Sequence, residues 1–229
     1  GIMLHAWFLP ARLPSRGTVL FLHGNAENIS THIGSVYWLP EKGFNVLLLD
    51  YRGYGRSQGV PTLNGVMMDV DSAMAALLAR PDVEPDRIAV FGQSLGGSVA
   101  LHYVAYSEHR SHVRALIVES AFANYRSIAR GKLAGFWLTW PFQWLPWLAI
   151  DGDHDPLAAA RRISPIPLLI IHGGRDTIVP VSHGERLYAA AREPKELWNL
   201  PGGKHIDAFR FQENRERFVA YLKARLGGR

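Results

Sequence analysis

Residues 91–97 read Phe-Gly-Gln-Ser-Leu-Gly-Gly and directly follow the apolar run Arg87-Ile88-Ala89-Val90. The stretch contains the pattern G-x-S-x-G, with Ser94 at its centre, between a predicted strand and a predicted helix. This is the setting of a nucleophile elbow, a strained turn that projects a serine hydroxyl above the end of a sheet. Glycine suits positions 92 and 96, because a side chain at either would collide with neighbouring backbone. The pattern is short enough to occur by chance, so the prediction depends on the sequence around it.

Apolar runs alternate with helical stretches along the chain. The predicted strands are 18–22, 45–49, 87–91, 115–118, 167–171 and 196–200, with an alternating segment at 4–9 as an edge strand. The predicted helices are 30–41, 66–79, 95–107, 182–191 and 206–226. Most of these strands are continuously apolar, which is typical of parallel strands covered on both faces. The pattern predicts an α/β fold with a doubly wound, mostly parallel sheet and helices on both faces.

One segment interrupts this alternation. Residues 131–150 hold four of the chain's seven tryptophans, together with prolines and glycines that disfavour one long helix. We expect a short Trp-rich cap insertion at about 124–160, folded over the active edge of the sheet. The length of 229 residues otherwise fits a single domain spanning 1–229.

The sequence offers an acid and a base to accompany Ser94. A serine nucleophile needs a base that takes its proton and an acid that orients the base. In sheets of this type the chain order is serine, then aspartate or glutamate, then histidine. Asp176 follows the predicted strand 167–171, and His205 follows the strand that ends at Leu200. All three residues are therefore expected at the carboxyl edge of the sheet, where open α/β folds bind ligands.

The remaining histidines have weaker claims to a catalytic role. His172 closes a predicted strand and His23 opens a glycine loop, so both are predicted to be structural. Three others lie on or just past the helix after Ser94 and are expected to point away from the sheet edge: His102, His109 and His112.

An oxyanion hole requires backbone N–H donors aimed at the reacting oxygen. One donor is expected from Leu95, directly after the nucleophile, and the other from the loop after an early strand. The stretch Phe21-Leu22-His23-Gly24-Asn25-Ala26 is that loop, and its glycine allows the chain to turn inward. We predict Asn25 as the second donor, with Ala26 as the alternative. The competing interpretation is a plain turn at the end of a strand.

Several other chemistries lack the residues they need. The chain has no cysteine, which excludes disulfides, thiolate metal sites and a cysteine nucleophile. Gly53-Tyr54-Gly55 follows a strand, but Gln58 stands where a dinucleotide fingerprint requires glycine. The acidic run from Asp151 has Pro156 where a calcium loop requires glycine. We therefore expect no cofactor and no metal ion.

The charge pattern favours a mildly basic enzyme. The net charge is +5, but basic residues alternate with apolar or acidic ones instead of forming a block. We therefore expect no nucleic-acid partner. The sequence contains no run of eighteen apolar residues, so we expect no membrane-spanning helix in it.

The chain resembles the α/β-hydrolase fold superfamily over nearly its whole length. The resemblance is carried by five motifs, at residues 22–27, 50–57, 92–97, 172–180 and 203–205. They are most similar to small serine hydrolases related to the α/β-hydrolase-domain proteins. Some members of this group are depalmitoylating thioesterases, and members are often named after serine aminopeptidases. The resemblance implies Ser94 as nucleophile, His205 as base and Asp176 as acid.

Such relatives often carry an apolar N-terminal anchor. This chain begins Gly1-Ile2-Met3 and enters strand-like sequence almost at once. A preceding anchor or signal therefore stays open, as does the compartment, whether cytoplasmic or membrane-associated. The oligomeric state is also open.

These features predict a serine hydrolase that cleaves carboxylic ester or thioester bonds of small acyl substrates through an acyl-serine intermediate. The alternative is a serine peptidase with the same triad, for which Glu119 would anchor a free amine. A non-catalytic binding module would tolerate loss of a triad member, and none is missing. Four aromatic residues of the insertion either line an acyl-chain pocket, cover the core or make peripheral contact with lipid: Trp137, Trp140, Trp144 and Trp147.

Overall fold

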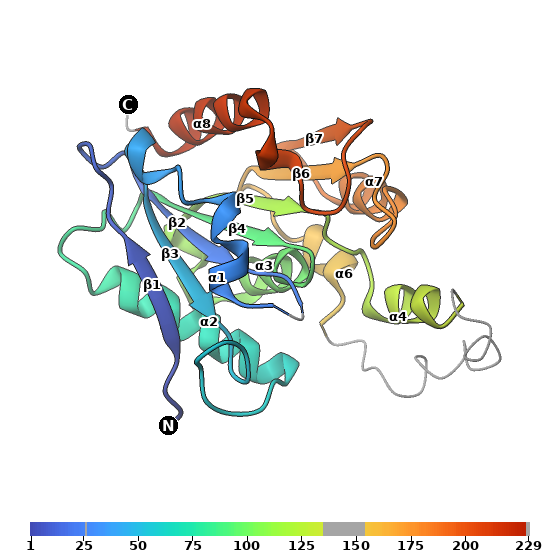
Figure 1. The fold of residues 1–229 in the computed structure, drawn as a ribbon, viewed down its shortest axis with the longest axis horizontal. Coiled ribbons are helices and arrows are strands. Elements are labelled where there is room, and N and C mark those ends of the chain that lie inside the picture. The colour runs from blue at the N-terminus through green and yellow to red at the C-terminus, as the bar shows by residue number, and fades with distance from the viewer. Residues whose placement is uncertain (26, 135–153, 228–229) are drawn as a thin grey trace.

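The computed structural model describes residues 1–25, 27–134 and 154–227, which are built around one seven-stranded sheet (Figure 1). The strands are β1 (His5–Leu9), β2 (Thr18–Leu22), β3 (Asn45–Asp50), β4 (Ile88–Gln93), β5 (Val113–Glu119), β6 (Leu168–Gly173) and β7 (Lys195–Leu200). Their spatial order is β1-β3-β2-β4-β5-β6-β7.

All neighbouring strands are parallel except β1, which runs antiparallel to β3 at one edge. The register sets Gln93 of β4 beside Glu119 of β5, and Glu119 beside Ile171 of β6. The carboxyl ends of β4 to β7 therefore meet at one edge of the sheet. Residues that directly follow these strands are brought together there.

The sheet separates two apolar cores. Leu20 and Leu22 pack on the side covered by α2 (Leu63–Leu78), α3 (Leu95–Tyr106), α6 (Pro156–Ala160) and α7 (Ser182–Ala190). Val19 and Phe21 pack on the other side, with α1 (Ile29–His32) and α8 (Gln212–Leu226). This alternation follows from the two-residue period of a strand. Figure 1 shows α8 and α3 on opposite faces of the sheet, so the predicted fold class is confirmed.

Two predicted helices are wrong in extent. The predicted helix 30–41 is instead α1, capped by the Asn28 side chain, followed by the short 3-10 helices η1 (Ile33–Ser35) and η2 (Pro40–Lys42). Pro40 has no backbone N–H to continue a helix, which explains the break before η2. The predicted helix 206–226 divides into η5 (Ala208–Arg210) and α8, because Phe211 has an extended backbone.

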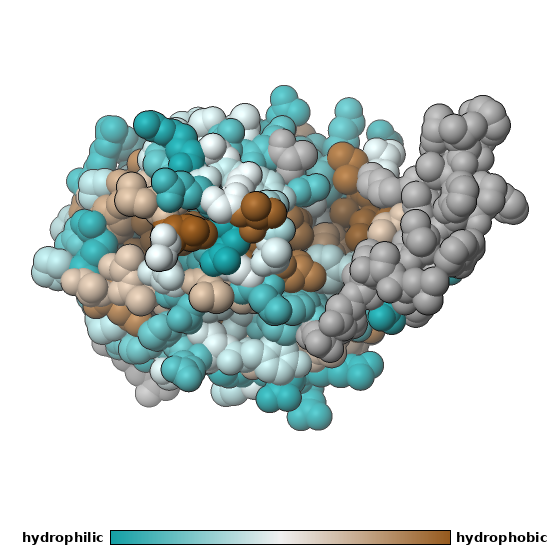
Figure 2. All heavy atoms as spheres, turned by 90° about the horizontal axis from the view of Figure 1, so that it is seen from below, coloured by the Kyte–Doolittle hydropathy of each residue, from teal (hydrophilic) through white to brown (hydrophobic). Residues whose placement is uncertain are grey.

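The described part of the predicted cap insertion contains α4 (Tyr125–Ala134) and α6. Its four tryptophans, at 137, 140, 144 and 147, lie outside the described residues, so the Trp-rich cap stays a prediction. On the face drawn in Figure 2, hydrophilic residues surround a few separate hydrophobic ones. None of the described helices has the length and apolar character needed to cross a bilayer.

Candidate active site

Ser94 occupies the turn between β4 and α3. Its backbone angles are φ 52° and ψ −114°, a conformation that non-glycine residues rarely adopt and that stores strain. The Ser94 N–H donates to the Glu119 carbonyl (2.8 Å), and the Ser94 carbonyl accepts from Gly97 (3.1 Å). The turn is therefore fixed to the neighbouring strand on one side and to the helix on the other, as the elbow prediction requires.

The glycines of the motif have the steric role predicted for them. A Cβ atom on Gly92 would overlap the carbonyl oxygen of Gly96. A Cβ atom on Gly96 would overlap the carbonyl oxygens of Leu22 and His23, because α3 begins directly against the end of β2. Any other residue at either position would push the helix away from the sheet.

Asp176 and His205 form the second part of the site. The Asp176 Oδ2 atom accepts a hydrogen bond from His205 Nδ1 at 2.8 Å, and its Oδ1 atom accepts from the N–H groups of Ile178 (2.9 Å) and Val179 (2.8 Å). The carboxyl side chain is 0% exposed. Burial opposes its ionisation, but the hydrogen bonds from His205, Val179 and Ile178 outweigh burial and lower the pKa of Asp176.

The ionised carboxylate fixes the histidine's proton. Because a carboxylate only accepts hydrogen bonds, the proton of His205 lies on Nδ1 and Nε2 is left as the basic nitrogen. The His205 side chain is 14% exposed, so the ring is held at the edge of the protein interior.

The His205 loop is tied to the residues beside Ser94. The N–H of Ile206 donates to the Ser120 hydroxyl (3.4 Å), and the N–H of Ala208 donates to a carboxyl oxygen of Glu119 (3.0 Å). Glu119 in turn accepts the backbone N–H of Ser94. Among the described residues no hydrogen bond joins the Ser94 hydroxyl to His205. Catalytic hydrogen bonds are often long without substrate and tighten when it binds.

The predicted oxyanion loop lies against the elbow. A Cβ atom on Gly24 would sit 3.5 Å from the Ser94 Cβ, so the loop and the serine are neighbours. The Asn25 side chain accepts a hydrogen bond from the Tyr54 hydroxyl (2.6 Å), which holds the residue in place. Leu95 is the first residue of α3, where backbone N–H groups lack helical partners and the helix dipole favours negative charge. Ala26, the alternative donor, lies outside the described residues.

His23 has the structural role expected of it. Its side chain is fully buried, and its Nδ1 atom is hydrogen-bonded to the Gly24 carbonyl at 2.6 Å. Burial lowers the pKa of His23 to about 4. The neutral ring therefore shapes the loop from inside, and the Tyr51 hydroxyl supports the same loop by donating to the His23 carbonyl (3.1 Å).

A cavity of about 370 Å³ opens beside these residues and is lined by Ser94, Leu95 and Asn25. This volume suits a small organic ligand. The rest of its lining is largely apolar and comes from the chain after β5, from α4 and from the Asp176 loop: Phe122, Tyr125, Ile128, Ala129, Ile178 and Val179. Sequence reasoning did not identify these wall residues, although all follow the carboxyl ends of β5 and β6.

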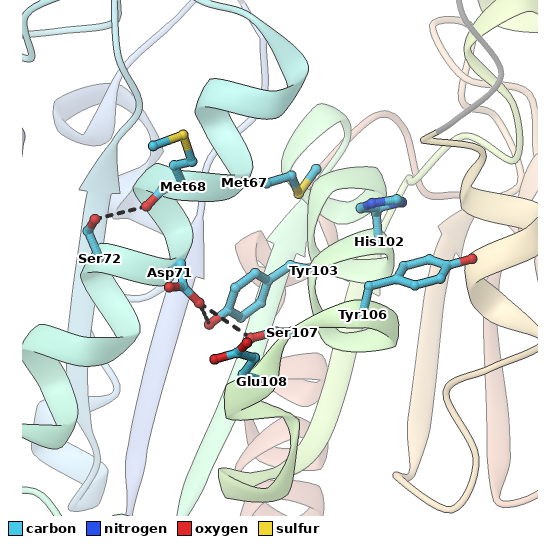
Figure 3. Close-up of a pocket in the computed structure, with 9 residues that line it drawn as sticks. All are labelled: Met67, Met68, Asp71, Ser72, His102, Tyr103, Tyr106, Ser107 and Glu108. Carbon is cyan, nitrogen blue, oxygen red and sulfur yellow. Dashed lines mark hydrogen bonds between the residues drawn. The ribbon is translucent and has the colours of Figure 1, made fainter.

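A second hollow, of about 420 Å³, lies between α2 and α3 (Figure 3). The Tyr103 hydroxyl donates to Asp71 there (3.3 Å), and His102, the preceding residue of α3, also lines the hollow. His102 thus lines a different cavity from Ser94, and burial lowers its pKa to about 4. Among the described residues no group of three or more His, Asp or Glu side chains could hold a metal ion.

The expectation for Glu119 as an amine anchor is wrong. Its side chain is 2% exposed, and its carboxyl oxygens accept hydrogen bonds from Gln93 and from the Ala208 N–H. The physical reason is that β5 continues through Glu119 instead of ending at Val118. The carboxyl group therefore lies under the sheet edge and does not line the cavity next to Ser94.

Comparisons with known proteins agree with this architecture. A family model described as "Serine aminopeptidase, S33" matches residues 14–164. The "Uncharacterized protein YfhR" of Escherichia coli (strain K12) is 38% identical over 233 residues, covering 99% of this chain and 78% of that protein. The "Alpha/beta hydrolase domain-containing protein WAV2" of Arabidopsis thaliana is 36% identical over 228 residues, covering 91% and 70%.

Among solved structures, the Pyrococcus furiosus esterase PF2001 superimposes with a TM-score of 0.78 at 25% sequence identity, covering 99% of this chain and 87% of that one. The elbow, the buried Asp–His pair and the strand order thus occur together with sequence similarity over most of the chain. The chain belongs to the α/β-hydrolase superfamily, in the family whose model is described as serine aminopeptidase, S33.

Proposed function

We propose that the protein is a serine hydrolase that cleaves carboxylic ester or thioester bonds of acyl substrates, with Ser94, His205 and Asp176 as its triad. The observation that carries the proposal is the part-buried 2.8 Å hydrogen bond between His205 and Asp176, whose loop lines the same cavity as a serine in a strained turn. A nucleophile must project from its turn, and the turn at Ser94 between β4 and α3 has the conformation of such an elbow.

The reaction proceeds by two acyl transfers. His205 Nε2 takes the Ser94 hydroxyl proton while the oxygen attacks the acyl carbonyl carbon, and the protonated imidazole then gives this proton to the leaving alkoxide or thiolate. Water repeats the sequence on the acyl-serine, releasing the carboxylic acid and restoring the hydroxyl. Asp176 stays ionised throughout and stabilises the imidazolium, in line with its lowered pKa.

The backbone N–H groups of Leu95 and Asn25 are the proposed donors to the negatively charged oxygen of each tetrahedral intermediate. Each donor of this kind lowers the barrier by roughly 3 kcal/mol. The positive end of the α3 dipole adds to the same stabilisation, because the oxygen forms at the first turn of the helix.

The lining of the cavity supports an apolar acyl group as the substrate portion that binds there. Phe122, Tyr125 and Ile128 offer aromatic and branched side chains, and none of the described residues that line the cavity is a carboxylate. We therefore propose a preference for medium or long acyl chains over acetyl. The four tryptophans of the insertion are proposed to extend this pocket, so replacing all four with alanine is expected to remove the preference.

The test is a panel of p-nitrophenyl esters and acyl thioesters run with the wild-type protein, Ser94→Ala and Ser72→Ala. Ser72 is a matched control, because its hydroxyl donates within its own helix, to the Met68 carbonyl. Ser94→Ala should lose turnover and labelling by a fluorophosphonate, whereas Ser72→Ala should keep both. Unchanged turnover in Ser94→Ala would refute the assignment, and a strict acetyl preference would refute the acyl pocket.

A peptidase is the second candidate, because the matching family model is described as a serine aminopeptidase. It would use the same triad but would need an acidic group near the cavity to bind a free amine. The burial of Glu119 removes the candidate that the sequence offered. Hydrolysis of an aminoacyl p-nitroanilide faster than of an acyl ester would favour the peptidase.

A further inference from the structure

Glu119 is a buried carboxyl that joins two separate loops of the site. One of its oxygens accepts from the Gln93 side-chain amide at 2.6 Å, and the other accepts from the Ala208 N–H at 3.0 Å. Gln93 directly precedes Ser94, and Ala208 lies just beyond His205 in the chain. A single side chain therefore contacts both the elbow and the loop that carries the base.

The hydrogen bonds continue from Gln93 to a third part of the site. The Gln93 amide also donates to the Ser35 hydroxyl (2.9 Å), and its carbonyl oxygen is hydrogen-bonded to His32 Nδ1 (3.1 Å). The His32 ring supports the oxyanion loop, since a Cβ atom on Gly24 would lie 3.1 Å from its Cε1 atom. The three loops assigned to the nucleophile, the base and the oxyanion are thus linked beneath the sheet edge.

Burying the carboxyl group of Glu119 is energetically unfavourable. Burial disfavours the charged form and raises the pKa of Glu119 to about 7, although hydrogen bonds from Gln93 and Ala208 and the nearby His205 act in the opposite direction. Its two acceptors match two donors that would otherwise be unsatisfied. The carboxyl group therefore acts through the geometry of its partners, because it touches neither the cavity nor the Ser94 hydroxyl.

We propose that Glu119 is a positioning residue for the reaction proposed above: it holds the Ser94 elbow and the His205 loop in one geometry, so that the imidazole is aligned with both Asp176 and the serine. This inference rests on the proposed function. The alignment of the His205 imidazole then depends on donor–acceptor pairing between residues 93 and 119 as well as on the triad itself.

The test exchanges the two members of the pair. In Glu119→Gln, the new amide N–H must face either the Gln93 amide N–H or the Ala208 N–H. Two donors then face each other with no acceptor between them. Gln93→Glu sets two carboxyl groups against each other. The double variant Gln93→Glu/Glu119→Gln restores the match, because the new amide donates to the new carboxylate and still accepts from Ala208.

The measurements are kcat and KM for a p-nitrophenyl ester, the fluorophosphonate labelling rate and the melting temperature. Each single variant should lower kcat and labelling about 10- to 100-fold with KM within about threefold, and the double variant should recover to within about fivefold of wild type. The control is Asn45→Ala, which removes a buried polar residue (3% exposed) at the opposite end of the sheet. It should lower the melting temperature and keep kcat within about twofold.

Either of two results would overturn the inference: a folded Glu119→Gln with kcat and labelling within twofold of wild type, or a double variant as impaired as the worse single variant. If the single variants do not fold, the double variant decides, and its failure to fold or to react also overturns the inference. A wild-type protein that neither hydrolyses esters nor is labelled would instead refute the proposed function, so the two failures are distinguishable.

Discussion

Replacing Asp176 with asparagine isolates the electrostatic part of the proposed triad from its structural part. The asparagine oxygen can still accept from the N–H groups of Ile178 and Val179, so the loop keeps both bonds that the Asp176 Oδ1 atom now makes. The new amide, however, donates toward His205 Nδ1 and forces the ring proton onto Nε2. The histidine then has no free nitrogen facing the serine.

The expected loss in kcat/KM is about 10³- to 10⁴-fold, or roughly 4–5.5 kcal/mol of transition-state stabilisation. Ester hydrolysis and thermal melting should be measured together, because the melting temperature of Asp176→Asn should stay near that of wild type. Asp176→Ala is the comparison, since it leaves two N–H groups without their acceptor. Asp176→Ala should lower the free energy of unfolding by about 2 kcal/mol and the melting temperature by roughly 4–8 °C. An Asp176→Asn protein that melts normally and stays within tenfold of wild-type activity would contradict the assigned acid.

Three further outcomes are expected. Ser94→Gly should abolish turnover yet raise the melting temperature by a few degrees, because glycine relieves about 1 kcal/mol of strain at φ 52°; an unchanged or lower melting temperature would argue against a strained elbow. Ile128→Trp narrows the cavity, so kcat/KM for an octanoyl ester should fall about tenfold relative to acetyl, and equal effects on both would place the acyl chain elsewhere. His23 has a folded pKa of about 4, so the unfolded chain binds its proton first, and stability falls as the pH drops below about 6.5. Between pH 7 and pH 4.5, urea unfolding of the wild-type protein should show that His23 contributes roughly 2–3 kcal/mol to the loss in the free energy of unfolding. The loss should be smaller in His23→Asn, and equal losses in the two proteins would refute this role of His23.

The strands and the places of Ser94, Asp176 and His205 at the ends of strands could be predicted because local sequence determines them. Continuous apolar runs indicated parallel strands, and the residues that follow such strands must meet at one edge of the sheet. The prediction of Asp176 and His205 depended on this rule, and the structure joins the two by a hydrogen bond. Ser94 was marked by glycines whose absent side chains leave room for α3.

The cavity wall and the role of Glu119 depend on tertiary contacts that no local pattern shows. Tyr125 and Ile128 line the cavity only because α4 lies beside the elbow. For Glu119 the deciding fact is one residue of strand length. Since β5 includes position 119, its side chain falls on the same face as Ile117, and sequence patterns place strand ends too loosely to reveal this.

The division of the interior by the sheet has a consequence for how mutations combine. Leu20 and Phe21 adjoin in the chain, but their side chains pack in different cores, so the stability effects of substitutions at the two positions should be nearly additive. Phe21 and Phe91 are distant in the chain, yet their rings are 5.3 Å apart between centroids. Stability effects of substitutions at that pair should be non-additive, so core side chains are coupled across strands more than along them.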